Sequence, residues 1–172
     1  MPSTTYQHLP KEKQLKIEAA LLKEFSSYSL ADAQVARIVK DVGIARGAFY
    51  KYFENIQAAY IYLYQQAVLE IHTGIVGRQK LSAKDYYQQV SLFVNVVNGS
   101  KYHEMMKLHF EINEQLVKIA DNRNLRPKSA SEWAIMILSH ETIRECLEKP
   151  SQSVKLLKRY YQAVIPLTKE EK

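Results

Sequence analysis

The sequence contains a single cysteine, five glycines and five prolines among 172 residues. Cys146 has no second cysteine for an internal disulfide or a thiolate zinc site, so no such staple is expected. The low glycine and proline content excludes a collagen-like or linker-like chain. No apolar run approaches the roughly 18 to 20 residues that a bilayer span requires, and residues 1–10 lack a secretory signal. We therefore expect a cytoplasmic protein that has no contact with a membrane.

Sequence motifs of common enzymes are also missing. The chain has no phosphate-binding glycine loop, no nucleophile elbow and no His-Glu-x-x-His pattern. His103 and His109 are six residues apart, which places them on different faces of a helix. We therefore predict no enzymatic activity, no metal site and no cofactor. Two interpretations of Cys146, a redox sensor and a small buried hydrophobe, both remain open.

Hydrophobic residues make up 47% of the chain, and their spacing has the period of α-helices. Ile17, Leu21 and Phe25 recur every four positions and predict an amphipathic helix over residues 11–26. The same reasoning predicts helices over residues 33–42 with Asp32 as N-cap, 46–53, 55 to 75 or 76, 86–97, 105–119, 133–138 and 154–165. The sequence therefore predicts an all-α protein.

Two of the short predicted helices are joined by a turn that contains Gly43, which favours a helix-turn-helix. The stretch from Val35 to Phe53 resembles the DNA-binding domain of the tetracycline-repressor (TetR) family of transcriptional regulators, and the resemblance extends over residues 11–64. It implies a DNA-binding domain over residues 1–54 and a helical ligand-binding and dimerisation domain over residues 55–172. Ile56 departs from the family pattern, because a phosphate-contacting lysine is common there.

The second helix of such a motif enters the major groove with its N-terminal residues against the base edges. Arg46 can donate two hydrogen bonds to guanine, and Ala45 and Ala48 can contact thymine methyl groups. Gly47 permits close approach of the backbone. We predict phosphate contacts from Tyr50, Lys51 and Tyr52, and from Gln34 with its backbone amide.

Other residues near the motif have simpler interpretations. We expect Phe49 and Phe53 to form the core of the three-helix unit, and Arg37 and Lys40 to be solvated. Residues 1–60 contain eight Lys and Arg against six Asp and Glu, whereas residues 34–53 alone contain four against one, so the basic charge is local. We therefore expect modest nonspecific affinity for DNA and a main contribution from two half-sites bound by a dimer.

The two C-terminal helical segments, residues 133–138 and 154–165, are apolar on several sides. Such a helix has to be covered all round. We favour cover by a second copy of the chain, packed across a two-fold axis as a four-helix bundle. The alternative is a central helix in the monomer's own core.

Aromatic and polarisable residues on the long helices can enclose an apolar pocket. By the family resemblance, such a pocket would hold a small-molecule effector of unknown identity. The candidate lining residues are Tyr64, Phe93, Tyr102, Met105, His109 and Trp133.

These inferences favour a ligand-responsive homodimeric regulator that binds a double-stranded DNA operator, with a repressor favoured over an activator. The alternative from another class is a helical ligand carrier or interaction module that no longer binds DNA.

Overall fold

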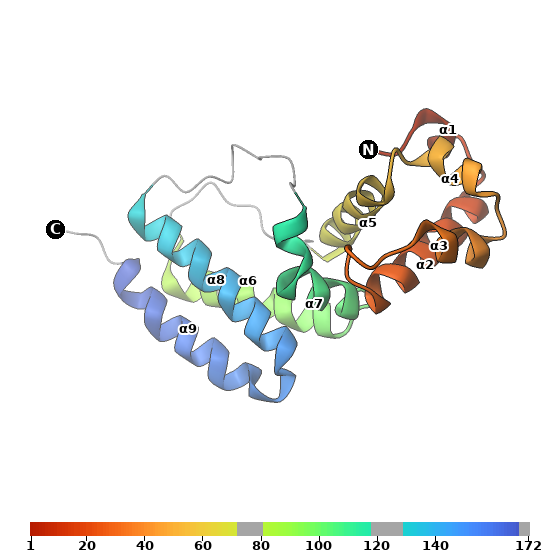
Figure 1. Ribbon diagram of the computed structural model, residues 1–172. Helices are drawn as coiled ribbons and strands as arrows, with labels where there is room; N and C mark the ends of the chain where they lie inside the picture. The colour runs from red at the N-terminus through yellow and green to blue at the C-terminus, as the bar shows by residue number, and fades with distance from the viewer. Residues whose placement is uncertain (72–80, 118–128, 169–172) are drawn as a thin grey trace. The chain divides into compact units, whose positions relative to one another are not determined.

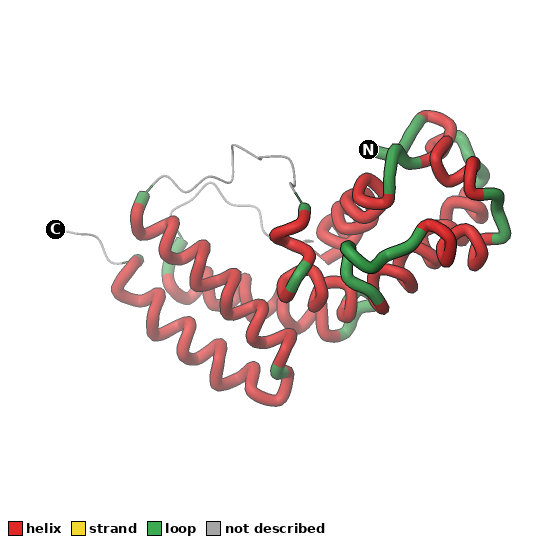
Figure 2. The backbone as a smooth tube through the Cα atoms, in the orientation of Figure 1, coloured by secondary structure: helices red, strands yellow, loops and turns green. Residues whose placement is uncertain are grey.

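The computed structural model describes residues 1–71, 81–117 and 129–168. These residues form helices and connecting loops, with no strand among them, which confirms the all-α class (Figures 1 and 2). None of the described helices is long and apolar enough to cross a membrane. The chain forms two compact units, Met1–Glu70 with Tyr102–Ile119, and Ile71–Lys101 with Ala120–Lys172. The predicted domain boundary after residue 54 stays a prediction.

The first unit contains the expected helix-turn-helix region and one helix that the periodicity did not predict, α1. Its elements are α1 (Thr4–Gln7), α2 (Lys11–Ser27), α3 (Val35–Val42), α4 (Arg46–Tyr52), α5 (Ile56–Ile71), α7 (His103–Glu111) and the 3-10 helix η1 (Asn113–Leu116). The stripe of Ile17, Leu21 and Phe25 on α2 is buried, at 1%, 0% and 0% exposure. This burial confirms the amphipathic interpretation of that segment.

The predicted start of α3 was two residues too early, and Asp32 is not its N-cap. The helix begins at Val35, and Gln34 has the extended backbone conformation of the N-cap. Asp32 instead belongs to a turn with Ser29: the Ser29 hydroxyl donates to Asp32 Oδ2 at 2.6 Å, and the Asp32 amide donates to Ser29 O at 3.0 Å. The Asp32 side chain thus forms a local turn with Ser29 and does not cap α3.

The single helix predicted over residues 105–119 is interrupted at Ile112. Ile112 has φ −136° and ψ −50°, outside the helical region, and separates α7 from η1. Asn113 is fully buried, and its Oδ1 accepts a hydrogen bond from the Leu30 amide at 2.8 Å. A regular helix would present Asn113 in another direction, so this buried bond accompanies the break. The predicted end of the helix beyond residue 117 lies outside the described residues, as does the predicted end of α5 near residue 76.

The second unit packs α6 (Ala83–Asn98), α8 (Ala130–Glu148) and α9 (Ser153–Leu167) against one another, with the short η3 (Pro150–Gln152) before α9. Ser82 begins α6 with a capping box, because its side chain accepts from the Asp85 amide while Asp85 accepts from the Ser82 amide. The core includes Val94 from α6, Cys146 from α8 and Val164 from α9, each 0% exposed. Three helices are therefore enough to bury one face of each.

Candidate nucleic-acid interface

The turn between α3 and α4 closes as the glycine spacing predicted. Gly43 has φ +74°, a conformation that side chains with a Cβ rarely adopt. The amides of Gly43 and Ile44 both donate to Val39 O at 3.0 Å, and Ala45 is the N-cap of α4. The predicted helix-turn-helix is therefore present, with residues 43–45 as its turn.

The solvent side of α4, together with its N-cap, presents mainly polar and small side chains. Ala45, Arg46, Gly47, Tyr50 and Lys51 are all exposed. The guanidinium carbon of Arg46 lies 6.0 Å from the centre of the Tyr50 ring, and its Nη2 lies 3.5 Å from the Tyr50 hydroxyl oxygen. These two side chains therefore share one face of the helix, as their spacing of four residues requires.

Two other predicted contacts on α4 are less accessible. Ala48 is half-buried. Tyr52 is only 6% exposed, and its ring centre lies 6.0 Å from that of Tyr6 in an edge-to-face arrangement. Most of the Tyr52 ring thus packs inside the protein, which leaves Tyr50 and Lys51 as the more suitable phosphate ligands.

An aromatic core lies on the opposite side of α4. Phe49 and Phe53 are each 1% exposed, with ring centres 5.6 Å apart. Phe53 also packs against Tyr62 of α5 at 5.7 Å. The prediction that both phenylalanines are core residues is confirmed, and their packing fixes which face of α4 remains free.

The start of α3 is fixed by a buried carboxylate on α2. Glu24 is 4% exposed and accepts from Arg37 Nη2 at 2.6 Å, from Arg37 Nε at 2.9 and 3.0 Å, and from the Gln34 amide at 2.7 Å. Arg37 Nη2 also donates to Asp32 O at 2.8 Å, and the guanidinium carbon lies 3.8 Å from the centre of the Tyr28 ring. The hydrogen bond with Glu24 raises the pKa of Arg37. The interpretation of Arg37 as merely solvated was therefore wrong.

This arrangement also bears on the predicted role of Gln34. The Gln34 amide is occupied by Glu24 and so is not available to a phosphate in this structure. The Gln34 side chain is exposed and lines a shallow hollow with Arg46 and Ile56. The hollow lies where α3, α4 and α5 begin, so two of the predicted DNA contacts lie at one place.

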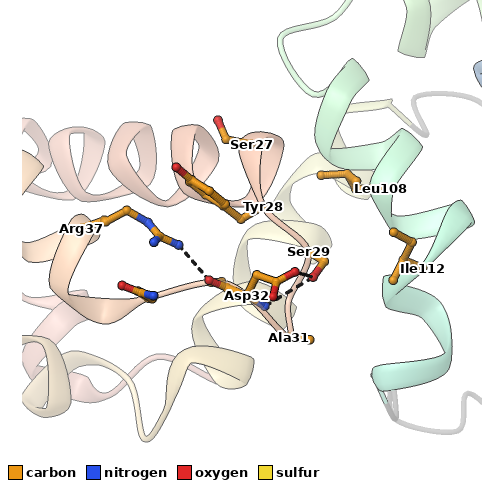
Figure 3. A pocket seen from close by; sticks show the side chains of 10 residues that line it. Ser27, Tyr28, Ser29, Ala31, Asp32, Arg37, Leu108 and Ile112 are labelled. Atoms are coloured by element: carbon orange, nitrogen blue, oxygen red, sulfur yellow. Dashed lines mark hydrogen bonds between the residues drawn. The ribbon is translucent and has the colours of Figure 1, made fainter.

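A second hollow lies between the loop that follows α2 and the α7 segment (Figure 3). Tyr28 and Arg37 line one side, and Leu108 and Ile112 line the other. Two hydrogen bonds within the protein are drawn there: Arg37 Nη2 donates to Asp32 O, and the Ser29 hydroxyl donates to Asp32 Oδ2. It contains none of the six residues predicted to line an effector pocket.

Four of those six predicted residues belong to the first unit. Tyr64 is half-buried and its ring stacks on His109, with centres 4.0 Å apart. His109 is 1% exposed, and its Nδ1 lies 2.9 Å from the Tyr60 hydroxyl. Burial raises the pKa of Tyr64 to about 12. Tyr102 donates to Glu70 Oε2 at 2.8 Å, and Met105 is fully buried.

The remaining two predicted effector residues belong to the second unit. Phe93 is 7% exposed and Trp133 is 56% exposed. The structure therefore brings together Tyr64 and His109, while the full predicted set stays a prediction.

The thiol of Cys146 lies in an environment that makes it unreactive. Cys146 is fully buried, and this burial raises the pKa of its thiol. A buried thiol with a raised pKa is a poor nucleophile and a poor redox sensor, which favours the interpretation as a small hydrophobe. Among the described residues, no group of three His, Cys, Asp or Glu side chains is placed to hold a metal ion.

The polar contacts that hold the motif together were not predicted from the sequence. Glu24 lies three residues after Leu21, on the apolar face of α2, and is therefore buried. A carboxylate at such a position needs a partner, and this is the signal in the sequence that predicts a basic residue beside it. The partner, Arg37, is 13 residues away. For Asn113, which bonds a residue 83 positions away, no comparable signal exists in the sequence.

The geometry defines an all-α helix-turn-helix protein in which the second helix of the motif exposes a polar face. No protein-family model matches the chain. The chain is 24% identical over 147 residues to a protein of Bacillus subtilis (strain 168) described as the uncharacterized HTH-type transcriptional regulator YdgC, covering 79% of this chain and 75% of that protein.

Two solved structures have a similar fold. One is a TetR family transcriptional regulator from Chloroflexus aurantiacus J-10-FL, with a TM-score of 0.56, 17% identity and coverage of 98% of this chain and 97% of that one. The other is the transcriptional regulator FadR from Bacillus subtilis in complex with stearoyl-CoA, with a TM-score of 0.53, 17% identity and coverage of 88% and 97%. The chain has the fold of TetR-family regulators, which confirms the resemblance seen in the sequence.

Proposed function

We propose that this protein is a DNA-binding transcriptional regulator, a repressor that binds a palindromic operator as a homodimer and responds to a small molecule. The observation that carries the proposal is the exposed polar face of α4, held outward by the aromatic core beneath it. The relatives described as transcriptional regulators support the same conclusion.

The chemistry of α4 suits the major groove of DNA. The groove admits one α-helix, and an arginine there can donate two hydrogen bonds to guanine. Arg46 begins the helix and is exposed, with Gly47 next to it. Tyr50 and Lys51 follow on the solvent side, where phosphate contacts would set the register of the helix.

Part of the positive charge around the motif is paired with acidic side chains of the same chain. Lys23 pairs with Asp41 at 2.7 Å, and Arg37 pairs with Glu24. Few cations are therefore left to bind phosphates without regard to sequence, and affinity has to come from base contacts and from a second half-site.

Selection of duplexes from a random pool tests the proposal most directly. We expect enrichment of an inverted repeat whose half-sites are about one helical turn apart, roughly 34 to 36 Å. Binding to the selected duplex should weaken as salt rises, because phosphate contacts release counterions. A pool that stays random after repeated rounds would instead favour the helical carrier or interaction module.

A homodimer explains the open face of α8. Trp133, Met136 and Ile137 are 56%, 40% and 47% exposed, and their spacing of three and four residues puts them on one side of the helix. Exposed apolar patches of this kind mark protein interfaces. We propose that α8 and α9 pack on the same helices of a second copy across a two-fold axis.

Ligand response would act through α5. Tyr60 of α5 packs edge-to-face on Phe25 of α2, with ring centres 5.0 Å apart, and bonds His109 of α7 at 2.9 Å. A ligand that shifts α7 would thus change the support of α2 through Tyr60. Two α4 helices can engage one face of DNA only at a fixed separation, so a small displacement would prevent simultaneous binding.

Linkage gives a quantitative test of the ligand response. Because FadR forms a complex with stearoyl-CoA, stearoyl-CoA is the first probe, with coenzyme A as the control. If it is the effector, the probe and the selected duplex should weaken each other's binding by the same factor, about 5- to 150-fold. A probe that binds equally well with and without saturating duplex does not regulate DNA binding.

A further inference from the structure

The helix α4 is held at its C-terminal end by a residue from the beginning of the chain. The last carbonyl groups of an α-helix have no partner within the helix. The Ser3 amide donates to Tyr52 O at 2.9 Å, and the Ser3 hydroxyl donates to Lys51 O at 2.6 Å. Ser3, which is 48 positions from Lys51, therefore satisfies two carbonyl groups of the last turn of α4. Figure 1 shows α1 beside α4.

The four-residue helix α1 is itself held at both ends. Ser3 is its N-cap and accepts from the Tyr6 amide at 3.2 Å. Gln14 of α2 donates through Nε2 to Tyr6 O, Gln7 O and Leu9 O at 3.3, 3.1 and 3.0 Å. An isolated helix of this length is unstable in water, so these contacts explain why the segment is ordered against α4.

Tyr6 adds an aromatic anchor under the same end of α4. It is 2% exposed, and its ring centre lies 5.1 Å from that of Phe53 and 5.4 Å from that of Tyr62. Its hydroxyl lies 3.2 Å from Glu18 Oε1 on α2. Tyr6 thus connects α1 to Glu18 of α2, to Tyr62 of α5 and to Phe53, the C-cap of α4.

We propose that Ser3 and Tyr6 are positioning residues for DNA binding, which set the direction of α4 without contacting DNA themselves. This inference rests on the proposed function. The physical reason is the length of α4, which has seven residues and cannot maintain its own direction. Its N-terminal side chains have to reach base edges, whereas the Ser3 bonds use only backbone carbonyls at the other end.

The substitution Ser3→Ala removes the hydroxyl and leaves the core unchanged. We expect binding to the duplex selected by the wild type to weaken about 3- to 10-fold, as the loss of one hydrogen-bonding group implies. Hydrogen exchange at the amides of residues 50–53 should become faster in the free protein, while exchange in α8 stays unchanged. Ser3→Thr, which retains a hydroxyl and suits an N-cap, should restore both values.

Thr5→Ala is the matched control, because Thr5 lies on α1 with an exposed side chain. It should bind DNA as the wild type does. Faster exchange in α4 with unchanged DNA affinity for Ser3→Ala would overturn the positioning role. Weaker binding with unchanged exchange would also overturn it, because Ser3 would then act on DNA directly. Failure of the wild type to select any duplex would overturn the proposed function itself.

Discussion

The helices α4 and α8 differ in where their apolar side chains lie. In α4, Phe49 and Tyr52 are 1% and 6% exposed, and the side chains that face solvent are chiefly polar or small. In α8, Ile135 is 4% exposed, but Trp133 and Ile137 remain open at 56% and 47%. The large apolar side chains of α4 are thus mostly buried within the single chain, whereas several of those on α8 are exposed.

The two partners proposed for these helices differ in the same way. A polar face supported by a complete core suits a hydrated, charged partner such as DNA, which is read by hydrogen bonds. An apolar face left open on a second side suits a protein surface of the same character. The comparison can be tested by substitutions on each helix, which should affect stability, association and DNA binding separately.

The largest effect is expected in the core beneath α4. Phe49→Ala should lower the free energy of unfolding by about 3 to 5 kcal/mol, because it leaves a cavity in a close-packed aromatic cluster. The nearby Lys51→Ala is the control, since Lys51 is exposed and loss of its side chain should cost less than about 0.5 kcal/mol. Denaturant unfolding measures both, and equal losses would contradict the assignment of the two faces.

A charge on the open face of α8 should prevent association. Ile137→Lys would place an unpaired ammonium group in a dimer interface, at a cost of several kcal/mol, so the dimer dissociation constant should rise at least about 100-fold. Leu92→Lys is matched to it, because Leu92 is apolar, 56% exposed and on α6, and it should leave the dimer intact. Sedimentation of the wild type as a monomer at micromolar concentration would refute the proposed interface.

Loss of charge at the buried carboxylate of α2 should have a smaller effect. Glu24→Gln weakens charge-assisted hydrogen bonds to Arg37 and to the Gln34 amide, and we expect a loss of about 1.5 to 3 kcal/mol in unfolding free energy. Glu12→Gln is the control, because the side chain of Glu12 is 81% exposed and pairs with Lys16 on the surface. Thermal or denaturant unfolding of both variants should separate them clearly.

The smallest effect on the folded protein is expected at the solvent face of α4. Arg46→Ala should weaken binding to the selected duplex by about 1 to 3 kcal/mol, while the melting temperature stays nearly constant. Lys149→Ala removes one exposed positive charge from the second unit and should have little effect on binding. Equal affinity of wild type and folded Arg46→Ala would remove Arg46 from the interface.

Much of the fold and part of the candidate site followed from local sequence pattern. The spacing of Ile17, Leu21 and Phe25 predicted α2, and Gly43 predicted the turn before α4. The same pattern placed Arg46 and Tyr50 on one face, because a residue and its fourth neighbour share a side of any α-helix. Such rules depend on neighbouring residues alone, so they can be applied without tertiary structure.

The ends of the helices and the polar contacts that hold them could not be predicted from the local sequence pattern. Asp32 is a good N-cap in composition, yet its side chain bonds Ser29, and α3 begins later. The segment after Met105 has continuous helical periodicity, yet it breaks at Ile112. In both places a side-chain hydrogen bond competes with regular helix, and the periodicity of apolar residues carries no information about that competition.

The sequence by itself determined the all-α class, the helix-turn-helix and the faces of its helices, because these depend on periods of three to four residues and on one glycine. The tertiary structure alone decided how the motif is held: Glu24 with Arg37, Ser3 with Lys51, and Asn113 with Leu30, which are 13, 48 and 83 residues apart. Each of these pairs joins groups that a chain can bring together only after its helices have packed, because a polar group finds its partner where burial removes water.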